Sequence, residues 1–396
     1  MNLLKIAWKN IVFKPLNTTL SLVLLSFGVG IISLLLLLEV QLQEQFDRNI
    51  KDIDMVLSAK GSPLQIILAN VYHIDAPTGN IKYSDARRVM KHPLIEQAIP
   101  LAYGDNYKMF RIVGTEHSYP EHYEMDLDEG VLWSAPYEVT VGANVAQSLD
   151  LKLGDTFHSA HGLQDETDVH ADHNFKVVGI FEANGTVIDQ LILTAIESIW
   201  GVHDHAGEEV DPEDRPEDEI TAVLLKKKNP LALVTLPNTI RDTNMQLALP
   251  AIEINRLTQN FGIGIATLRG IAVLIMFISF ISVFISLYNS LKERKYELAL
   301  MRTMGGTRAV LFTLILLEGL LMVFGGILIG LLISRLGLYF LSNVMENQFH
   351  YSVANMGVLS GELWLVLITI FVGILASFLP ALKAVQMDIS KTLSDG

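Results

Sequence analysis

Residues 16–38 read LNTTLSLVLLSFGVGIISLLLLL, a run that contains no charged side chain. A helix needs about 20 apolar residues to cross a hydrocarbon core of ~30 Å, so this run predicts a transmembrane helix. Three further runs are long enough to do the same, at residues 271–291, 309–333 and 363–382. Only one of the four runs contains a charged residue, Glu318. The sequence therefore predicts four transmembrane helices.

The polar residues concentrate between the first two of these runs. Half of the 396 residues are hydrophobic, yet the formal net charge is −14. Residues 39–268 hold 36 acidic against 17 basic side chains, a net charge of −19. These numbers fit a chain divided into an apolar part and an acidic part. The acidity argues against nucleic acid as a partner, because phosphate binding needs a basic surface.

Lysine and arginine flank the apolar runs on one side. Three lysines and no acid precede the first run, and two lysines follow the fourth. The segment between the second and third runs adds Lys292, Arg294, Lys295, Arg302 and Arg308. Basic flanks stay in the cytoplasm, so both termini are predicted to be cytoplasmic and residues 39–268 extracytoplasmic.

The acidic segment mixes strand-like and helical patterns. Helical periodicity continues through residues 39–51 and 251–269, which predicts two helices that leave the membrane as a stalk. Strand-like runs lie at 109–114, 138–141, 176–181, 190–194 and 221–226, and helical runs at 83–91, 144–149 and 230–244. Such a mixture predicts α+β subdomains. The predicted fold class is membrane α+β, with four transmembrane helices and a large mixed α/β extracytoplasmic domain inserted between helices 1 and 2.

The predicted organisation has three parts. Residues 1–38 form an amphipathic N-terminal helix, with Trp8 at headgroup level, followed by the first span. Residues 39–268 form the stalk and the α+β domain. Residues 269–396 contain the second, third and fourth spans, with a basic cytoplasmic segment at 292–308.

Four stretches resemble one protein family. Residues 292–326, KERKYELALMRTMGGTRAVLFTLILLEGLLMVFGG, resemble a hallmark of the FtsX-like permeases, the MacB and LolCDE type of ABC transporter. Residues 3–30 and 378–396 resemble that family's first span and its C-terminus, LPA-x-x-A followed by D-x-x-x-x-L. Residues 139–157 and 175–200 resemble its periplasmic core. The resemblance covers nearly the whole chain in the expected order.

The resemblance implies the permease subunit of an ATP-driven ABC transporter in the bacterial cytoplasmic membrane. Such a subunit couples a separate ATPase to motion of its outer domain, for export or extraction of a lipoprotein, lipid, peptide or drug. Its implied partners are an ATPase dimer, a second permease copy or paralogue, membrane lipids and an extracytoplasmic protein. The sequence contains no G-x-x-x-x-G-K-[ST] phosphate cradle, so we expect no enzyme activity here and ATP only on a partner.

Residues 292–308 form a predicted coupling hairpin. Residues 293–304 have a helical pattern, which Gly305 and Gly306 would end, and Thr307 is a suitable N-cap for the next helix. By the resemblance, this hairpin lies against the ATPase. The residues expected at that contact are Glu293, Arg294, Glu297, Arg302, Gly305, Gly306 and Arg308. The alternative is an ordinary solvated helix, because charge pairs one turn apart are common.

Glu318 lies about 12 Å into the third span. An ionisable group at that depth is a candidate for function. The alternative is a structural carboxyl that is neutral or hydrogen-bonded between helices.

Two polar stretches carry most of the histidines. Residues 158–173 and 203–219 are predicted to be loops, because they are too polar to bury. The candidate metal ligands are His158, His161, His170, His173, His203 and His205, with carboxylates beside them. Imidazole and carboxylate suit zinc, although the spacing matches no fixed site. The alternatives are a solvated loop, a permease whose His-rich loops sense zinc, and a membrane-anchored metalloenzyme.

Overall fold

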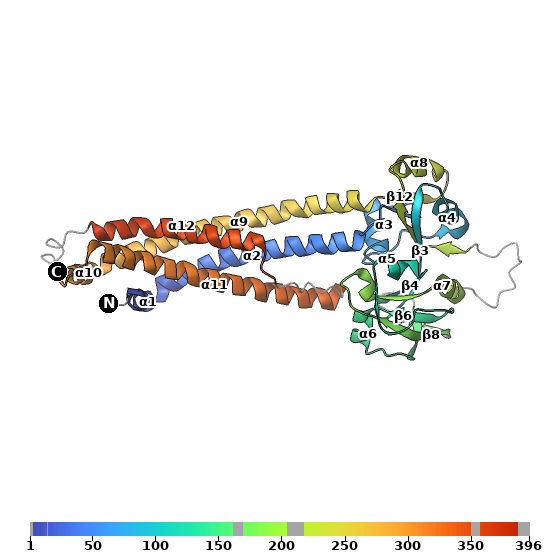
Figure 1. The fold of residues 1–396 in the computed structure, drawn as a ribbon, viewed down its shortest axis with the longest axis horizontal. Coiled ribbons are helices and arrows are strands. Elements are labelled where there is room, and N and C mark those ends of the chain that lie inside the picture. Colours follow the sequence, from blue (N-terminus) through green and yellow to red (C-terminus); the bar gives the residue numbers. More distant parts are fainter. Residues whose placement is uncertain (1–2, 14, 161–168, 204–217, 350–356, 387–396) are drawn as a thin grey trace, which may run out of the picture. The chain divides into compact units, whose positions relative to one another are not determined.

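The computed structural model describes residues 3–13, 15–160, 169–203, 218–349 and 357–386 (Figure 1). The chain divides into two compact units. The helical unit comprises Met1–Leu42 and Asn260–Gly396, and the sheet unit comprises Gln43–Gln259. Both divisions fall inside continuous helices, α2 (Pro15–Ile50) and α9 (Pro250–Glu293), so each of these two helices belongs to both units.

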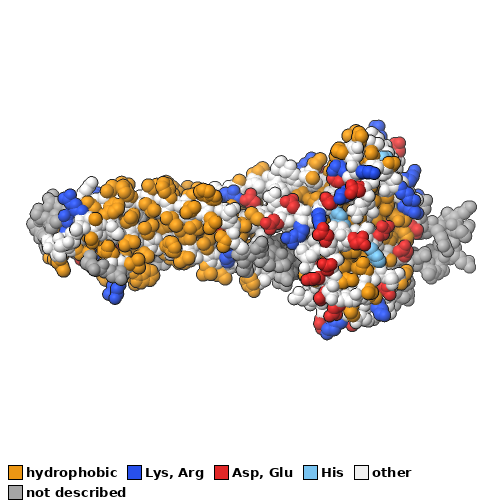
Figure 2. Space-filling model, in the orientation of Figure 1, with side chains coloured by type: hydrophobic (Ala, Val, Ile, Leu, Met, Phe, Trp, Pro, Cys, Tyr) orange, Lys and Arg blue, Asp and Glu red, His pale blue; other side chains and the backbone are white. Residues whose placement is uncertain are grey.

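The helical unit contains the four predicted spans. Its described elements are α1 (Leu3–Phe13), α2, α9, α10 (Lys295–Thr303), α11 (Arg308–Phe349) and α12 (Ser360–Val385). Among them, α2, α9, α11 and α12 are long and apolar enough to cross a membrane. Hydrophobic side chains cover the outside of this unit (Figure 2), as a lipid-facing surface requires. The four-span prediction is confirmed.

Two of the spans continue well past membrane length. The 36 residues of α2 and the 44 residues of α9 correspond to ~54 Å and ~66 Å of helix, against a hydrocarbon core of ~30 Å. The predicted helical continuation of both spans is confirmed. The first turns of α9 and the last turns of α2 are therefore available to the sheet unit.

Small residues set the spacing between the spans. A Cβ added at Gly330 of α11 would lie 2.8 Å from the carbonyl oxygen of Ser26 in α2. A Cβ at Gly319 would overlap the hydroxyl of Ser377 in α12, and one at Gly373 of α12 would lie 2.5 Å from Val323. Glycine at these positions lets α11 pack closely against both neighbours, which supplies the main attraction between helices in lipid.

The sheet unit is built on one ten-stranded sheet, counted over the described residues. The strand order is β12-β1-β11-β3-β4-β9-β6-β8-β5, with β7 paired to β3 and β8. The strands are β1 (Met55–Ala59), β3 (Ile95–Tyr107), β4 (Phe110–Thr115), β5 (Leu127–Gly130), β6 (Glu138–Val141), β7 (Thr156–Ala160), β8 (Val169–Phe181), β9 (Leu191–Ala195), β11 (Ala222–Lys227) and β12 (Met245–Ala248). Strands β2 (Ile81–Lys82) and β10 (Glu219–Ile220) form a separate pair.

Apolar clusters cover both faces of this sheet. Met55 and Leu57 of β1 belong to one buried cluster, and Val56 between them belongs to the other. The helices α3 (Pro63–Asn70), α4 (Tyr83–Met90), α5 (Ser118–His122), α6 (Ala143–Leu149), α7 (Ile196–His203) and α8 (Ala232–Thr239), with the 3₁₀ turn η1 (Val187–Gln190), complete the unit. A strand covered on both faces reads as a continuous apolar run, and for this reason β1 shows no alternation.

The predicted fold class, with a mixed α/β domain between the first two spans, is confirmed. The α+β subdomains share a single sheet, because β4 and β9 pair in parallel and join segments that are distant in the chain. Two expectations need correction. The expected helix at 230–244 is shorter, since α8 ends at Thr239 and β12 begins at Met245. The expected loop at 158–173 is strand at both ends, because β7 and β8 form an antiparallel hairpin with Ala160 opposite Val169. Its central residues, 161–168, lie outside the described residues, as do residues 204–217 of the second loop.

Candidate functional site: the coupling hairpin and the helix–domain joints

The coupling hairpin contains a break that the sequence did not indicate. Helix α9 ends at Glu293, Arg294 leaves helical geometry with φ −104° and ψ 17°, and α10 begins at Lys295. The expected continuous helix over 293–304 is therefore wrong. After α10, Gly305 adopts a left-handed φ of +97°, and the hydroxyl of Thr307 accepts a hydrogen bond from the Val310 N–H. The predicted glycine stop and N-cap are both present.

The break turns Arg294 towards the membrane-spanning helices. Its Nη1 lies 3.1 Å from Oε1 of Glu318 in α11, and its Nε lies 3.1 Å from Oε2 of Glu297. The side chain of Glu318 is only 3% exposed, and that of Arg294 is 12% exposed. Asn10 of α1 donates a hydrogen bond of 2.5 Å to the same carboxylate oxygen. One buried carboxylate thus connects α1, the start of α10 and α11.

This geometry favours the structural alternative for Glu318. A buried carboxylate that is paired with a guanidinium and also hydrogen-bonded has its charge compensated in place. Arg294 differs from the other residues expected at an ATPase contact, because its guanidinium is paired with the buried Glu318. Glu293, Glu297, Gly305 and Arg308 are exposed, whereas Arg302 and Gly306 are half-buried.

The exposed surface of α10 also carries apolar side chains that the sequence analysis missed. Tyr296 and Leu300 are 53% and 46% exposed, and their spacing of four residues places them on one face of α10. Met304, the C-cap that follows α10, is 80% exposed. Leu298 and Ala299 on the opposite side are buried, and Leu298 belongs to an apolar cluster of the helical unit. An apolar series at i, i+4 and i+8 is the sequence signal that marks this face. An exposed apolar stripe beside charged residues is typical of a protein contact.

A second buried ion pair lies near the other end of the spans. Arg335 of α11 binds Glu362 of α12 in a bidentate manner, with distances of 2.7 and 2.8 Å. The Ser33 hydroxyl of α2 lies 2.5 Å from Glu362 and 2.8 Å from the Ser334 hydroxyl. Sequence analysis missed this cluster because Arg335 and Glu362 lie just outside the apolar runs. The cluster ties α2, α11 and α12 together.

The last turn of α2 is fixed into the sheet unit. Asn49 is fully buried, its Oδ1 accepts the Val187 N–H at 3.0 Å, and its carbonyl accepts the Tyr123 hydroxyl at 2.8 Å. The ring of Phe46 packs edge-on against Tyr72 at 5.4 Å between centroids. At the other joint, Ile254 near the start of α9 belongs to the same buried cluster as Tyr72 and Tyr123. Both helices therefore enter the core of the sheet unit.

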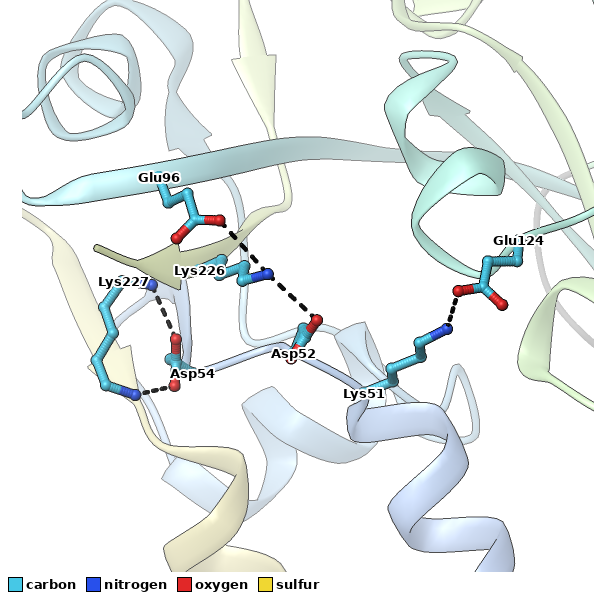
Figure 3. Close-up of polar contacts among 7 residues, drawn as sticks. All are labelled: Lys51, Asp52, Asp54, Glu96, Glu124, Lys226 and Lys227. Atoms are coloured by element: carbon cyan, nitrogen blue, oxygen red, sulfur yellow. Dashed lines mark hydrogen bonds and ion pairs between the residues drawn. The ribbon is translucent and has the colours of Figure 1, made fainter. Parts of the chain in front are cut away.

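Ion pairs surround the junction between α2 and β1 (Figure 3). Lys51 lies 2.6 Å from Glu124, and Lys226 lies 3.2 Å from Asp52 and 3.5 Å from Glu96. Lys227 pairs with Asp54 through both its ammonium and its backbone N–H. Hydrogen bonding to Lys51 lowers the pKa of Glu124, and hydrogen bonding to Asp52 raises the pKa of Lys226. Because these groups are partly or largely exposed, each pair contributes little to the free energy of unfolding. Their main effect is to favour one path of the backbone between α2 and β1.

Comparison with known families identifies the protein family of this chain. Residues 269–389 match the model of the FtsX-like permease C-terminal region, and residues 18–232, more than half of the chain, match the MacB-like periplasmic core domain. The chain belongs to the MacB-type, FtsX-like permease family. The sequence resemblance is thereby confirmed. Members of this family are permeases of ABC transporters and work with ABC ATPase partners, so this permease is a membrane protein.

Solved structures resemble the permease over about half of its length. The periplasmic region of MacB from Actinobacillus actinomycetemcomitans is 12% identical, with a TM-score of 0.36, over 54% of this chain and 96% of that one. The extracellular domain of the noncanonical ABC-type transporter YknZ from Gram-positive bacteria is 11% identical, with a TM-score of 0.30, over 49% and 98%. No protein of curated function matches the permease significantly.

The histidines proposed as metal ligands are only partly described. His158 is exposed in β7, His170 and His173 lie in β8, and His203 ends α7. The side chains of the last three, and all of His161 and His205, lie outside the described residues. Within the described part of the chain, no three histidine or carboxylate side chains are grouped so that they could hold a metal ion. Zinc binding by this permease stays a prediction.

His73 is a histidine with a structural role in the sheet unit. Its Nδ1 and Nε2 each lie 2.8 Å from a tyrosine hydroxyl, those of Tyr103 and Tyr119. The Tyr103 hydroxyl donates to the Ala69 carbonyl, so it accepts from Nδ1, and Tyr119 then donates to Nε2. A neutral imidazole, protonated at Nδ1, satisfies both contacts. Burial, with a smaller contribution from Arg111, holds the pKa of His73 well below its usual range.

We expect the sheet unit to lose stability as the pH falls below about 6.5, the pKa of an unfolded histidine. Below that pH the unfolded chain binds a proton at His73 that the folded unit does not bind, so protons favour unfolding. Urea unfolding of the full chain, followed by the fluorescence of Trp133 and Trp200, measures this. His73→Asn, which tolerates the left-handed backbone at this position, should flatten the pH dependence. His158→Gln should leave it unchanged, and an equal flattening in both variants would contradict the assignment.

Proposed function

We propose that this chain is the permease subunit of an ATP-driven transporter that moves its sheet unit mechanically, outside the cytoplasmic membrane. The observation that carries the proposal is that α2 and α9 are continuous helices, each of which enters the core of the sheet unit. A continuous helix transmits displacement and rotation along its length, whereas a flexible linker would absorb them. The cargo class is a lipoprotein, lipid, peptide or drug.

The ATPase would bind the coupling hairpin. The hairpin offers Tyr296 and Leu300 of α10 and the following Met304 as apolar contacts. Glu297 of α10 and Arg308 of α11 are its charged contacts. A contact with an apolar centre and a charged rim is common in protein interfaces. Arg294 has a different role in this proposal. Through its ion pair with Glu318 it transfers movement of α10 to α11 and, through Asn10, to α1.

The orientation of the chain and its assembly follow from the same proposal. The basic hairpin and both termini lie in the bacterial cytoplasm, and the acidic sheet unit lies outside. Two ATPase subunits pair with two permeases, the second being a copy or a paralogue of this chain. ATP is hydrolysed on the partner, and this chain supplies no catalytic residue. An extracytoplasmic protein would receive the movement or the cargo.

The test interrupts α2 just past its apolar run, where the helical unit ends and the sheet unit begins along the chain. Leu42, Gln43 and Glu44 are exposed, so their replacement changes helix stiffness and little packing. Three glycines weaken the helix by about 1 kcal/mol per residue relative to three alanines. The chain has no cysteine, so Lys152→Cys gives one spin label per protomer, whose interprotomer distance reports movement of the sheet unit.

In the complex with its ATPase, ATP should shift the distance distribution in the wild type and in the alanine variant. The glycine variant should hydrolyse ATP but show a clearly smaller shift, because α9 alone stays continuous. A full shift in the glycine variant would show that α2 does not transmit the movement. Failure of any ATPase to bind the chain would remove the proposal altogether.

A further inference from the structure

Strand β12 forms one edge of the ten-stranded sheet. It pairs with β1 through Val56–Ala59, and no other described strand pairs with it. An edge strand presents unpaired backbone N–H and C=O groups along its outer side. These groups can accept an extended peptide as a further strand, which is a common way for sheets to bind partners.

A cavity lies beside this edge, between β12 and α8. Leu247 and Leu249 line it from the sheet side, and Leu233, Pro237 and Ile240 line it from the helix side. Its volume is about 260 Å³, below the 300–1,000 Å³ typical of small-molecule sites. A space of this size and apolar character suits one or two aliphatic side chains of a bound segment.

The rim of the cavity is apolar on α8 and basic elsewhere. Leu233 of α8 lines the cavity and is 37% exposed. Leu231, directly before α8, and Val234 do not line the cavity but add exposed apolar surface next to Leu233, at 58% and 69%. Lys60 and Arg241 also line the cavity, and no ion pair joins either of them to another described residue. In a segment with a net charge of −19, two cations without an acidic partner favour an acidic ligand.

We propose that β12 and α8 form a docking site for an extended, acidic segment of a partner protein. The segment adds to the sheet beside β12 through main-chain hydrogen bonds and places aliphatic side chains in the cavity. Its carboxylates face Lys60 and Arg241. This site does not depend on ATP-driven movement, so it stands or falls separately from the transport proposal.

The probe is a fluorescein-labelled peptide of ten residues, with valine at the four central positions and glutamate at both ends. Binding to the full chain in lipid nanodiscs is measured by fluorescence anisotropy. The peptide should bind, and the same peptide with lysine at its ends should not. Lys60→Glu combined with Arg241→Glu should weaken the glutamate peptide by about tenfold and give binding of the lysine peptide. That gain also shows that the variant is folded.

Two further peptides test strand addition directly, each with alternate central amides N-methylated in one of the two registers. Only one edge of an added strand pairs with β12, so one peptide should bind and the other should not. Leu233→Arg, at the exposed mouth of the cavity, should also abolish binding. The proposal is overturned if the glutamate peptide does not bind, if charge reversal has no effect, or if both methylated peptides bind equally. Displacement of the peptide by decanoate alone would assign the cavity to an acyl chain and overturn it too.

Discussion

Replacing Arg294 with methionine is expected to destabilise the helical unit by about 3–5 kcal/mol, the usual effect of breaking a buried ion pair from one side. The carboxylate of Glu318 would remain 3% exposed with only Asn10 as a partner. Unfolding of the purified protein in detergent measures the change. The double variant Arg294→Met/Glu318→Leu should regain most of the stability, because it leaves no buried charge without compensation.

The controls for this prediction separate stability from transmission. Glu297 is the other partner of Arg294, and its side chain is 66% exposed. Glu297→Gln should therefore change the free energy of unfolding by less than about 1 kcal/mol. The double variant should fold and still bind the ATPase, but ATP should no longer shift the sheet unit. If the double variant is as unstable as Arg294→Met, the pair does not account for the loss. If it transmits movement normally, the role given to Arg294 is wrong.

Arg335→Met is expected to have an effect of similar size, about 3–5 kcal/mol, for the same reason. It leaves Glu362, 2% exposed, with Ser33 and the Leu359 N–H as its remaining partners. Arg335→Lys retains the charge but loses the bidentate geometry, so a smaller loss of about 1–2 kcal/mol is expected. The same unfolding measurement applies, and Arg335→Met/Glu362→Leu should recover stability as the matched double variant.

Combining the two single variants tests whether the clusters are independent. Glu318 and Arg335 are separated by 17 residues of α11, or ~26 Å, and the two clusters share no residue. Losses at sites so far apart usually add. Arg294→Met/Arg335→Met should therefore lose the sum of the two single effects. A clearly smaller loss would show that α11 couples the clusters.

The fold was predictable where the signal is carried by neighbouring residues. The four apolar runs predicted the four spans, and the strands β4, β6, β9 and β11 were expected within one residue at each end. Strands β1 and β12 were missed because short apolar runs do not distinguish a buried strand from a helix. The order of strands in the sheet could not be predicted, since pairings such as that of β4 with β9 join distant segments.

In the candidate site, too, the features set by neighbouring residues were predictable and those set by distant contacts were not. Gly305, Thr307 and the charges of the hairpin could be found by inspection, because turns and caps depend on a few successive residues. The role of Arg294 could not, because it depends on which helix faces its side chain. The pairs of Arg294 with Glu318 and of Arg335 with Glu362 exist only when α10, α11 and α12 have packed.

The sequence by itself determined that the chain has four spans, that an acidic domain lies between the first two, and that a basic hairpin follows the second. Each of these is a property of contiguous residues, namely hydrophobic length, charge balance and turn chemistry. Only the tertiary structure decided which charges are buried together, that α2 and α9 enter the domain core, and that β12 lies at an edge of the sheet. These features depend on contacts between distant segments, such as Ser33 with Glu362, whose separation of 329 residues hides them from any local pattern.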